Sequence, residues 1–284
     1  MIAFFGTGML GTGFVRALRK RGETVHVWNR TIAKAKPLEE AGAVVFEDPA
    51  AAAKGAERIH LSLNDDASVD DVLARAAVTR DQIIVDHTTT SATGTRARVA
   101  GWDAKGVRFV HAPVFMGPQN AHDSTGIMLV SGERARVDAV RPHLEKMTGK
   151  LLDLGDRVDA AAAYKLFGNC FLMFFTSGLA EVFTLARAVD IEPKEAANLF
   201  SHFNPGNLIG ARIERMLGAE WSKASWELSM ARKDARLMIE EGDRGGYPLH
   251  FLQTIAARMD ELIARGHGAS DWTVIAKDAV DAKK

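Results

Sequence analysis

The chain begins Met1-Ile2-Ala3-Phe4-Phe5-Gly6-Thr7-Gly8-Met9-Leu10-Gly11, a short apolar run followed at once by the pattern Gly-x-Gly-x-x-Gly. The apolar run is typical of a buried strand. After it, Phe14, Val15 and Leu18 recur at helical spacing up to Gly22. A strand, a glycine turn and a helix in this order predict the first unit of a dinucleotide-binding fold, in which the turn holds the pyrophosphate.

The three glycines have separate roles in this interpretation. Gly6 allows the tight turn, Gly8 lets backbone N–H groups approach a pyrophosphate, and Gly11 lets the helix pack closely on the strand. The helix N-terminus adds unpaired donors and a partial positive charge. The alternative is a tight turn that binds no ligand. The predicted coenzyme-binding residues in the turn are Gly6, Thr7, Gly8, Met9, Leu10 and Gly11.

Composition limits the classes of protein and partner. The chain has 284 residues, enough for two domains, and its 47% hydrophobic and 25% charged residues are typical of a globular protein. Lysine plus arginine and aspartate plus glutamate balance at 36 each. Because no net charge attracts nucleic acid or an anionic membrane, we expect neither as a partner. A strand that begins at residue 2 leaves no room for a signal peptide, so we expect a cytoplasmic protein.

The single cysteine, Cys170, excludes an internal disulfide and any cysteine-based zinc site. It lies in the apolar stretch 166–175, where we expect a buried, inert thiol. This stretch is shorter than the ~20 apolar residues that a membrane span needs. We interpret it as part of a helix that is buried between domains or between subunits.

Residues 1–157 alternate strand-like and helix-like patterns. The predicted strands after the first are 24–28, 43–46, 59–63, 82–86, 107–112 and 125–131. The predicted helices after the first are 33–41, 49–55, 65–77, 91–105 and 135–147. This alternation predicts an α/β Rossmann domain with a parallel, doubly wound sheet, in which the last two strands could run in mixed directions.

The pattern changes beyond Asp156, where almost no alternating strand pattern remains. Long amphipathic stretches cover 160–189, 193–202, 205–218, 227–241, 248–266 and 270–282. We therefore predict a second, all-helical domain over residues 158–284.

The second strand ends in Trp28-Asn29-Arg30-Thr31. NAD-selective folds carry a carboxylate at this place for the ribose 2′-hydroxyl, whereas NADP-selective folds carry an arginine for the 2′-phosphate. The planar guanidinium of Arg30 can hold a 2′-phosphate with its fork of N–H groups, and the short side chains of Asn29 and Thr31 add hydrogen-bond donors. The alternative is a solvated surface arginine. We predict NADP (NADPH) as the coenzyme, with Leu63 also lining its site.

Lys165 and Asn169 stand four residues apart, on one helix face in an apolar segment. A lysine there can donate a proton to a carbonyl oxygen and accept it in the reverse reaction. Burial lowers the pKa of a lysine from its usual ~10.4 toward the working range. The alternative is a lysine that extends to solvent from the start of a helix.

Four blocks of this sequence together resemble the β-hydroxyacid dehydrogenase family, which includes 3-hydroxyisobutyrate dehydrogenases and glyoxylate or succinic semialdehyde reductases. The blocks are Gly6–Gly11, Asp86–Ser91, Ala112-Pro113-Val114 with Gly117 and Gly126, and Lys165…Asn169 with Lys233-Asp234. The resemblance implies a Rossmann domain joined by a long helix to a helical domain, hydride transfer to a small carbonyl or hydroxy acid substrate, and usually a homodimer.

The resemblance also implies roles for particular residues. Lys165 is the general acid/base and Asn169 holds the substrate. Thr89 lines the nicotinamide and substrate site. Lys233 reaches the coenzyme, and Asp234 fixes that turn beside the substrate site.

The departures from the family concern the substrate. Phe115-Met116-Gly117 stands where the family has Ser-Gly-Gly, which binds the substrate carboxylate. This segment is predicted to line the substrate site, but two apolar side chains leave open whether the substrate carries a carboxylate. Imine-reducing relatives carry Asp or Tyr in place of the lysine, and Tyr164 is adjacent, so imine reduction remains an alternative. A non-catalytic NADP(H)-sensing protein is the other alternative.

Three histidines, His87, His111 and His122, lie near predicted strand ends or loops. Their neighbours lack the spacing of metal ligands, so we expect no metal site. We interpret all three as polar residues at the rim of the domain.

Overall fold

The computed structural model describes residues 1–281, so residue 282 of the last predicted helix and residues 283–284 of the second predicted domain lie outside it. The chain divides into two compact units, Met1–Cys170 and Phe171–Lys284. Helix α7 (Ala160–Ala188) begins in the first unit and ends in the second. The division therefore falls inside α7, whereas the sequence places the domain boundary at residue 157, before this helix begins.

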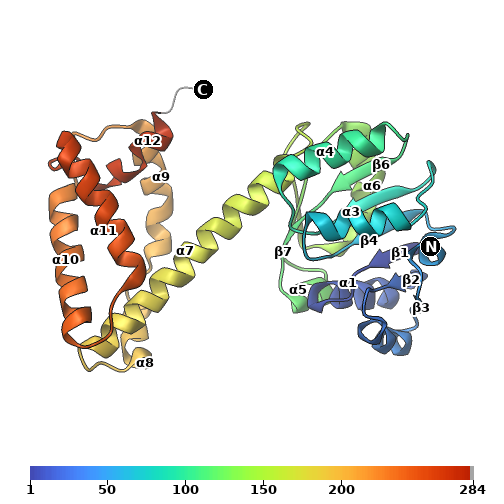
Figure 1. The fold of residues 1–284 in the computed structure, drawn as a ribbon, viewed down its shortest axis with the longest axis horizontal. Coiled ribbons are helices and arrows are strands. Elements are labelled where there is room, and N and C mark those ends of the chain that lie inside the picture. The colour runs from blue at the N-terminus through green and yellow to red at the C-terminus, as the bar shows by residue number, and fades with distance from the viewer. Residues whose placement is uncertain (282–284) are drawn as a thin grey trace. The chain divides into compact units, whose positions relative to one another are not determined.

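The first unit contains a six-stranded sheet in the order β3-β2-β1-β4-β5-β6, with all neighbours parallel. The strands are β1 (Ile2–Phe5), β2 (Val25–Trp28), β3 (Val44–Phe46), β4 (Arg58–Leu61), β5 (Ile83–Asp86) and β6 (Arg108–His111). The strand order reverses next to β1, which creates a crevice at the carboxyl ends of β1 and β4. This topology confirms the predicted doubly wound Rossmann sheet (Figure 1).

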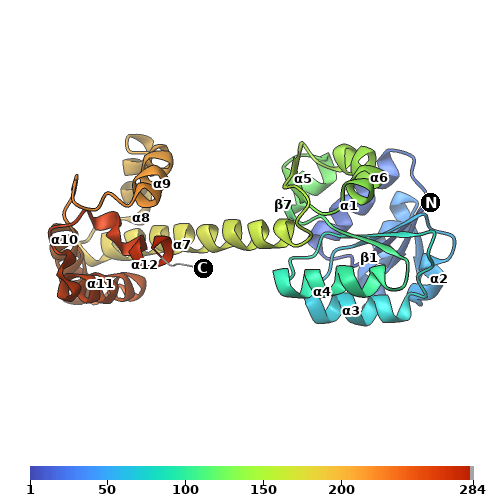
Figure 2. The ribbon, with the colours of Figure 1, turned by 90° about the horizontal axis from the view of Figure 1, so that it is seen from above.

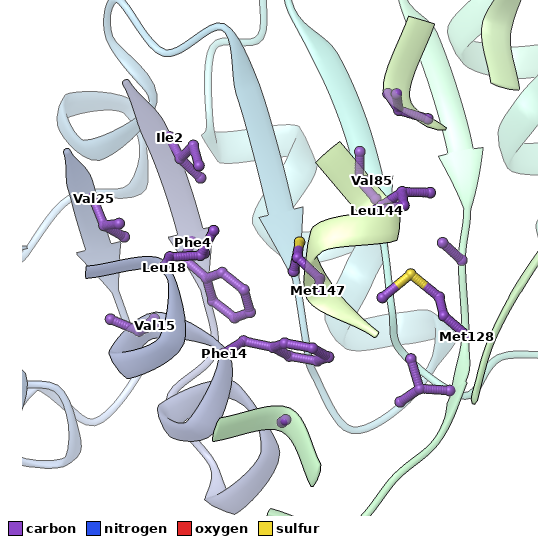
Figure 3. Close-up of a cluster of buried hydrophobic side chains, with 14 of the residues drawn as sticks. Ile2, Phe4, Phe14, Val15, Leu18, Val25, Val85, Met128, Leu144 and Met147 are labelled. Carbon is purple, nitrogen blue, oxygen red and sulfur yellow. The ribbon is translucent and has the colours of Figure 1, made fainter. Parts of the chain in front are cut away.

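Helices cover both faces of this sheet (Figure 2). One face carries α1 (Met9–Lys20), α5 (Pro118–Asp123) and α6 (Arg134–Leu144), and the other carries α2 (Pro49–Ala53), α3 (Asp66–Arg75) and α4 (Ala92–Asp103). Successive strand residues point to opposite faces, so Ile2 and Phe4 join the first core and Ala3 and Phe5 join the second. This explains the continuous apolar run of β1. Figure 3 shows the first core, in which Phe4 packs beside Phe14.

A second, three-stranded sheet follows, formed by β7 (Val114–Phe115), β8 (Ile127–Val130) and β9 (Lys150–Asp153). β7 and β8 are antiparallel, and β8 and β9 are parallel. The strand predicted at 125–131 therefore exists but does not extend the main sheet. The sequence missed β7, β9 and α5, because β7 has only two residues and β9 is only partly buried.

The predicted helix at 33–41 is wrong in type. The structure has two short 3₁₀ helices there, Ile32–Lys34 and Lys36–Ala41. Pro37 lies at the start of the second one, and its missing N–H prevents a continuous α-helix through the segment.

The second unit is helical, as predicted. Its elements are the end of α7, then α8 (Pro193–Ala196), α9 (Ile209–Gly218), α10 (Leu228–Arg244), α11 (His250–Leu262) and α12 (Lys277–Val280), with short 3₁₀ segments at Ala197–Ser201, Pro205–Leu208 and Trp272–Ala276 and a π-helical turn at Ile263–His267. The core of this unit lies between α10, α11 and the Trp272–Ala276 segment, and contains Leu228, Ala231, Met259, Leu262 and Val274.

The apolar part of α7 is exposed in the single chain. Phe167, Phe171 and Phe174 are each more than half exposed, and Cys170 is also exposed. The expected buried thiol is therefore wrong for the single chain. By length and composition alone α7 would also suit a membrane, since an 18-residue window has a mean hydropathy of 1.5.

Candidate active site

The glycine turn joins β1 to α1 through two very close backbone approaches. Gly6 has a φ of +95°, and a Cβ there would lie 2.2 Å from the carbonyl oxygen of Ser62. A Cβ at Gly11 would lie 2.0 Å from the carbonyl oxygen of Gly6. Any side chain at either position would push the turn away from β4 or from α1. These contacts explain why only glycine fits at both places.

Gly8 differs from the other two glycines because it faces open space. A Cβ there would have no heavy atom within 4 Å, and no side chain caps the N-terminus of α1. The first N–H groups of the helix are therefore directed at an open position beside the turn. A helix start of this kind fits a phosphate, so these residues would hold the pyrophosphate of a dinucleotide.

A cavity of about 140 Å³ continues from the turn to the end of β2. It brings together six of the predicted coenzyme residues: Gly6, Gly8, Asn29, Arg30, Thr31 and Leu63. Lys34, Asn64 and Ser68 also line it, and the sequence analysis missed them. The sequence did carry a signal for Lys34, because it places a second basic side chain four positions after Arg30, close to the end of β2. The lining thus combines two cations with one carboxylate, Asp71, which accepts a hydrogen bond from Arg75.

Asn29 connects the glycine turn to the end of β2. Its side-chain oxygen accepts a hydrogen bond from the backbone N–H of Thr7 at 3.0 Å, and its amide nitrogen donates to the carbonyl oxygen of Thr31 at 2.7 Å. A carboxylate could accept the first hydrogen bond but could not donate the second. Asn29 therefore shapes this corner of the cavity without adding a negative charge to it.

The threonine run after β5 lies at the carboxyl end of the sheet. Thr88 and Thr90 are buried: Thr88 accepts a hydrogen bond from the N–H of Leu63 at 3.0 Å, and Thr90 bonds to His111 at 3.2 Å. Thr89, between them, is exposed. Thr89 is thus the member of this run that is placed to meet a ligand.

Lys165 is nearly buried, with 9% of its surface exposed. Its ammonium donates a hydrogen bond to the Asn169 side-chain oxygen at 2.9 Å and lies 4.3 Å from the centre of the Phe115 ring. Burial lowers the pKa of Lys165. The structure therefore brings the predicted acid/base, its predicted amide partner and a predicted substrate residue into direct contact.

The segment Phe115-Met116-Gly117 leads from β7 into α5. A Cβ at Gly168 of α7 would lie 2.3 Å from the Phe115 ring, so the ring rests directly on the helix backbone. Met116 packs against the first core and beside Gly126. The N–H of Gly117 donates to the Asn120 side chain at 2.9 Å.

Lys233 and Asp234 belong to α10 in the second unit. There the Lys233 ammonium pairs with the Asp234 carboxylate at 2.7 Å, and both side chains are partly exposed. Their roles toward coenzyme and substrate stay predictions.

Two of the three histidines depart from the sequence interpretation. His87 and His111 are buried, not at the rim, because the residues at these strand ends lie beneath the flanking helices. His87 bonds to His60 at 3.0 Å and to the carbonyl oxygen of Ala112 at 2.7 Å. Burial lowers the pKa of both His87 and His111 to about 4. His122 is only partly exposed and pairs with Asp123.

Comparisons with known proteins place this chain among NAD(P)-dependent oxidoreductases. The family model described as the NAD binding domain of 6-phosphogluconate dehydrogenase matches residues 1–155. Mitochondrial 3-hydroxyisobutyrate dehydrogenase of Drosophila melanogaster is 31% identical over 188 residues, covering 65% of this chain and 58% of the relative. The 3-sulfolactaldehyde reductase of Escherichia coli (strain K12) is 24% identical over 281 residues, covering 96% and 94%.

The fold is also shared with solved structures. An imine reductase from Myxococcus stipitatus, in complex with NADP+, superposes with a TM-score of 0.88. It is 20% identical, with 98% of this chain and 99% of that chain covered. At this identity the likeness describes the architecture and leaves the reaction open.

Proposed function

This chain belongs to the β-hydroxyacid dehydrogenase family and is an NAD(P)-dependent oxidoreductase, and from that we propose that it transfers hydride between NADPH and a small aldehyde or keto acid, or the matching hydroxy acid. The observation that carries the proposal is the contact between Lys165 and Asn169. A nearly buried lysine with an amide partner suits proton transfer to a carbonyl oxygen better than it suits structure alone.

The preference for NADP rests on the cavity at the end of β2. Arg30 and Lys34 both line it, and Asn29 stands where an acidic side chain would repel a 2′-phosphate. The residues that would hold the rest of the coenzyme are the glycine turn and the open N-terminus of α1. The M. stipitatus imine reductase was solved with NADP+, which is in keeping with this preference.

Lys165 and Asn169 carry out the proton transfer that accompanies hydride transfer. When bound, NADPH supplies the hydride that reduces the carbonyl carbon and is itself oxidised by two electrons. Lys165 gives the proton to the carbonyl oxygen, so the product is the alcohol and the lysine is left neutral until it takes a proton from water. Asn169 holds the ammonium through its side-chain oxygen. Because burial lowers the pKa of Lys165, this ammonium releases its proton more readily than an exposed lysine.

The decisive experiment removes the proton donor and leaves the coenzyme site intact. We expect Lys165→Met to lower kcat by about 10²–10⁴-fold on the best carbonyl substrate of a panel, the usual contribution of general acid catalysis. The panel contains glyoxylate, succinic semialdehyde, simple aldehydes and cyclic imines, and the readout is loss of reduced nicotinamide. NADPH affinity should stay unchanged. Undiminished turnover in the variant would reject Lys165 as the acid.

Two alternatives are decided by the same panel. Tyr164 is half exposed beside Lys165, which favours imine reduction as the second candidate. Turnover of the cyclic imines alone would select it. NADPH binding without turnover of any panel member would indicate a sensing protein.

We also propose that the enzyme is a homodimer. The exposed apolar part of α7, together with an apolar hollow of about 330 Å³ between α7, α10 and α11, is the kind of apolar surface that marks a protein–protein contact.

A further inference from the structure

The surroundings of the Lys165 ammonium are unusual for a cation. Its contacts are the Asn169 oxygen at 2.9 Å and the face of the Phe115 ring, 4.3 Å from the ring centre. No carboxylate of residues 1–170 pairs with it. An aromatic face attracts an ammonium through its quadrupole, and the attraction grows when water is excluded. The ring therefore occupies a place where a counter-anion would otherwise stand.

The position of the ring is built into the fold. Phe115 ends β7, where it is paired with Ile127 of β8. Gly168 leaves the backbone of α7 bare, and its absent Cβ would lie 2.3 Å from the ring. Phe115 and Gly168 are thus complementary in shape, and the ring has no room to move toward the helix.

At Gly117 and Pro118, shortly after Phe115, no backbone N–H is free to donate a hydrogen bond to an anion. The N–H of Gly117 is used by the Asn120 side chain, and Pro118 has no N–H. The nitrogen of Asn120 is used in turn by Thr125 at 3.0 Å.

Two arginines beside the start of α7, Arg157 just before the helix and Arg96 of α4, already pair with a carboxylate. Arg96 and Arg157 both donate to Asp159, at 2.6 Å each for their shortest contacts. A substrate carboxylate arriving beside Lys165 would therefore lose its hydration and compete with the reacting carbonyl for the ammonium that serves as the proton donor.

We propose that Phe115 is a specificity-determining residue that restricts the site to carbonyl or imine substrates without a carboxylate. This inference rests on the proposed function and narrows its substrate class. An uncharged substituent can pack against the ring and leave the Lys165 proton for the carbonyl oxygen. A carboxylate would have to displace the ring or share the same ammonium.

The first test compares matched substrates on the unaltered enzyme with NADPH. The pairs are succinic semialdehyde with its methyl ester, and glyoxylate with its ethyl ester. We expect kcat/KM for each ester to exceed that for the acid by about tenfold or more, since a site rejects a group whose polar atoms it leaves unpaired. Equal values, or a preference for the acids, would overturn the inference.

A pair of variants tests whether Phe115 causes the preference. Phe115→Ser adds a hydroxyl donor and space, whereas Phe115→Leu removes the ring without adding a donor. We expect the ester-to-acid ratio to fall by about tenfold in the serine variant and to stay high in the leucine variant. An equal change in both variants, or in neither, would contradict the assignment to Phe115.

A measurement without turnover separates this inference from the proposed function. Acetylation of Lys165 by acetic anhydride, followed by peptide mass spectrometry on the NADP+-loaded protein, reports how often the amine is unprotonated. We expect butyrate to leave this rate unchanged in the unaltered protein and to slow it in Phe115→Ser, where a paired carboxylate would keep the proton on the amine. Slowing by butyrate in the unaltered protein would overturn the inference. If butyrate slows acetylation only in Phe115→Ser, but the unaltered protein reduces no carbonyl of the panel, the result would support the inference and reject the proposed reaction.

Discussion

Arg30 and Lys34 line the same cavity as the glycine turn, and the proposed preference for NADPH rests on their two positive charges. Asn29, between the turn and Thr31, keeps a negative charge out of this corner. At the scale of single residues, the proposed coenzyme choice and the proposed proton transfer both rest on a few polar atoms with defined partners. Two predictions belong to this scale.

We expect Arg30→Ser to raise KM for NADPH by about 10- to 100-fold, the equivalent of the ~1.5–3 kcal/mol that a hydrogen bond to a charged group contributes. KM for NADH should change little, because NADH has no 2′-phosphate. Initial rates at varied coenzyme concentrations measure both constants. Arg80→Ser is the matched control, since Arg80 is exposed and bonds to the carbonyl oxygen of Lys105, away from the cavity. An equal rise in KM for NADPH and for NADH would refute a contact between Arg30 and the 2′-phosphate.

The buried histidines make the stability of the protein depend on pH. Burial lowers the pKa of His87 and of His111 to about 4, and it lowers the pKa of His60 as well. Between pH ~6.5 and 4 the histidines of the unfolded chain bind protons, whereas the buried histidines of the folded protein stay neutral. The free energy of unfolding that these histidines contribute above pH 6.5 is therefore lost as the pH falls. Asp86 acts in the opposite direction. Burial raises the pKa of Asp86 to about 6. Its contribution to the free energy of unfolding is therefore present at low pH and is lost as the pH rises through 6.

The histidines outnumber the single carboxyl group, so the net change is a loss. We expect the free energy of unfolding to fall by about 2–3 kcal/mol from pH 7 to pH 5, at ~1.4 kcal/mol for each pKa unit of difference. Urea titrations at pH 7, 6 and 5 measure it. His87→Asn should make the dependence on pH weaker. An unchanged pH dependence in that variant would contradict the role of His87.

At the scale of elements, the start of α7 determines where Lys165 stands. Asp159 directly precedes the helix, and its buried carboxylate accepts from Arg157 and Arg96. The hydrogen bond from Arg157 contributes most to holding the pKa of Asp159 well below its usual range. Ala161 and Ala162 are fully buried, and the N–H of Ala161 donates to Ser131 at 2.9 Å. The first turn of α7 is thus held against the Rossmann domain, and Lys165 follows in the next turn.

We expect Asp159→Asn to destabilise the protein by about 1–2 kcal/mol, a modest value because both arginines are more than half exposed and water screens them. The lysine should also be less well placed, so kcat should fall while KM for NADPH stays unchanged. Urea unfolding and steady-state kinetics measure the two effects. Asp156→Asn is the control, because Asp156 also pairs with an arginine, Arg134, but its side chain is 79% exposed. Similar behaviour of the two variants would argue against Asp159 as an anchor of α7.

At the scale of the whole chain, two compact units share one helix whose middle carries exposed apolar side chains. An apolar helix face of this kind is typical of interfaces between identical subunits, which resemble a protein core. The oligomeric state is therefore the property to measure at this scale.

We expect the protein to behave in light scattering as a particle of twice its chain mass of 30.8 kDa. Phe171→Asp places a charge on the exposed face of α7 and should give a monomer, because an unpaired charge is costly to bury in an interface. Val44→Asp is the control, since Val44 is a half-exposed apolar residue on the edge strand β3. A monomeric unaltered protein, or a dimer that persists in Phe171→Asp, would show that this face is not the dimer contact.

Much of the fold was predictable from local patterns. Apolar runs, helical spacing and the glycine turn identified the strands of the main sheet and most helices of both units, because these signals lie within about ten residues of one another along the chain. The same local signals identified Arg30, Lys165 and Asn169 as candidates. Where a local signal was weak, as in the two-residue strand β7, or interrupted, as at Pro37, the prediction failed.

Burial and long-range contacts were decided only by the tertiary structure. The sequence misjudged His87, His111 and Cys170, because exposure depends on which distant segments cover a residue. The meeting of Phe115 with Lys165 and Gly168, some fifty positions later, has no local signal at all. The sequence by itself thus determined a dinucleotide-binding fold followed by a helical domain. Only packing between segments far apart in the chain decided that the lysine faces an aromatic ring and that the histidines are neutral and buried.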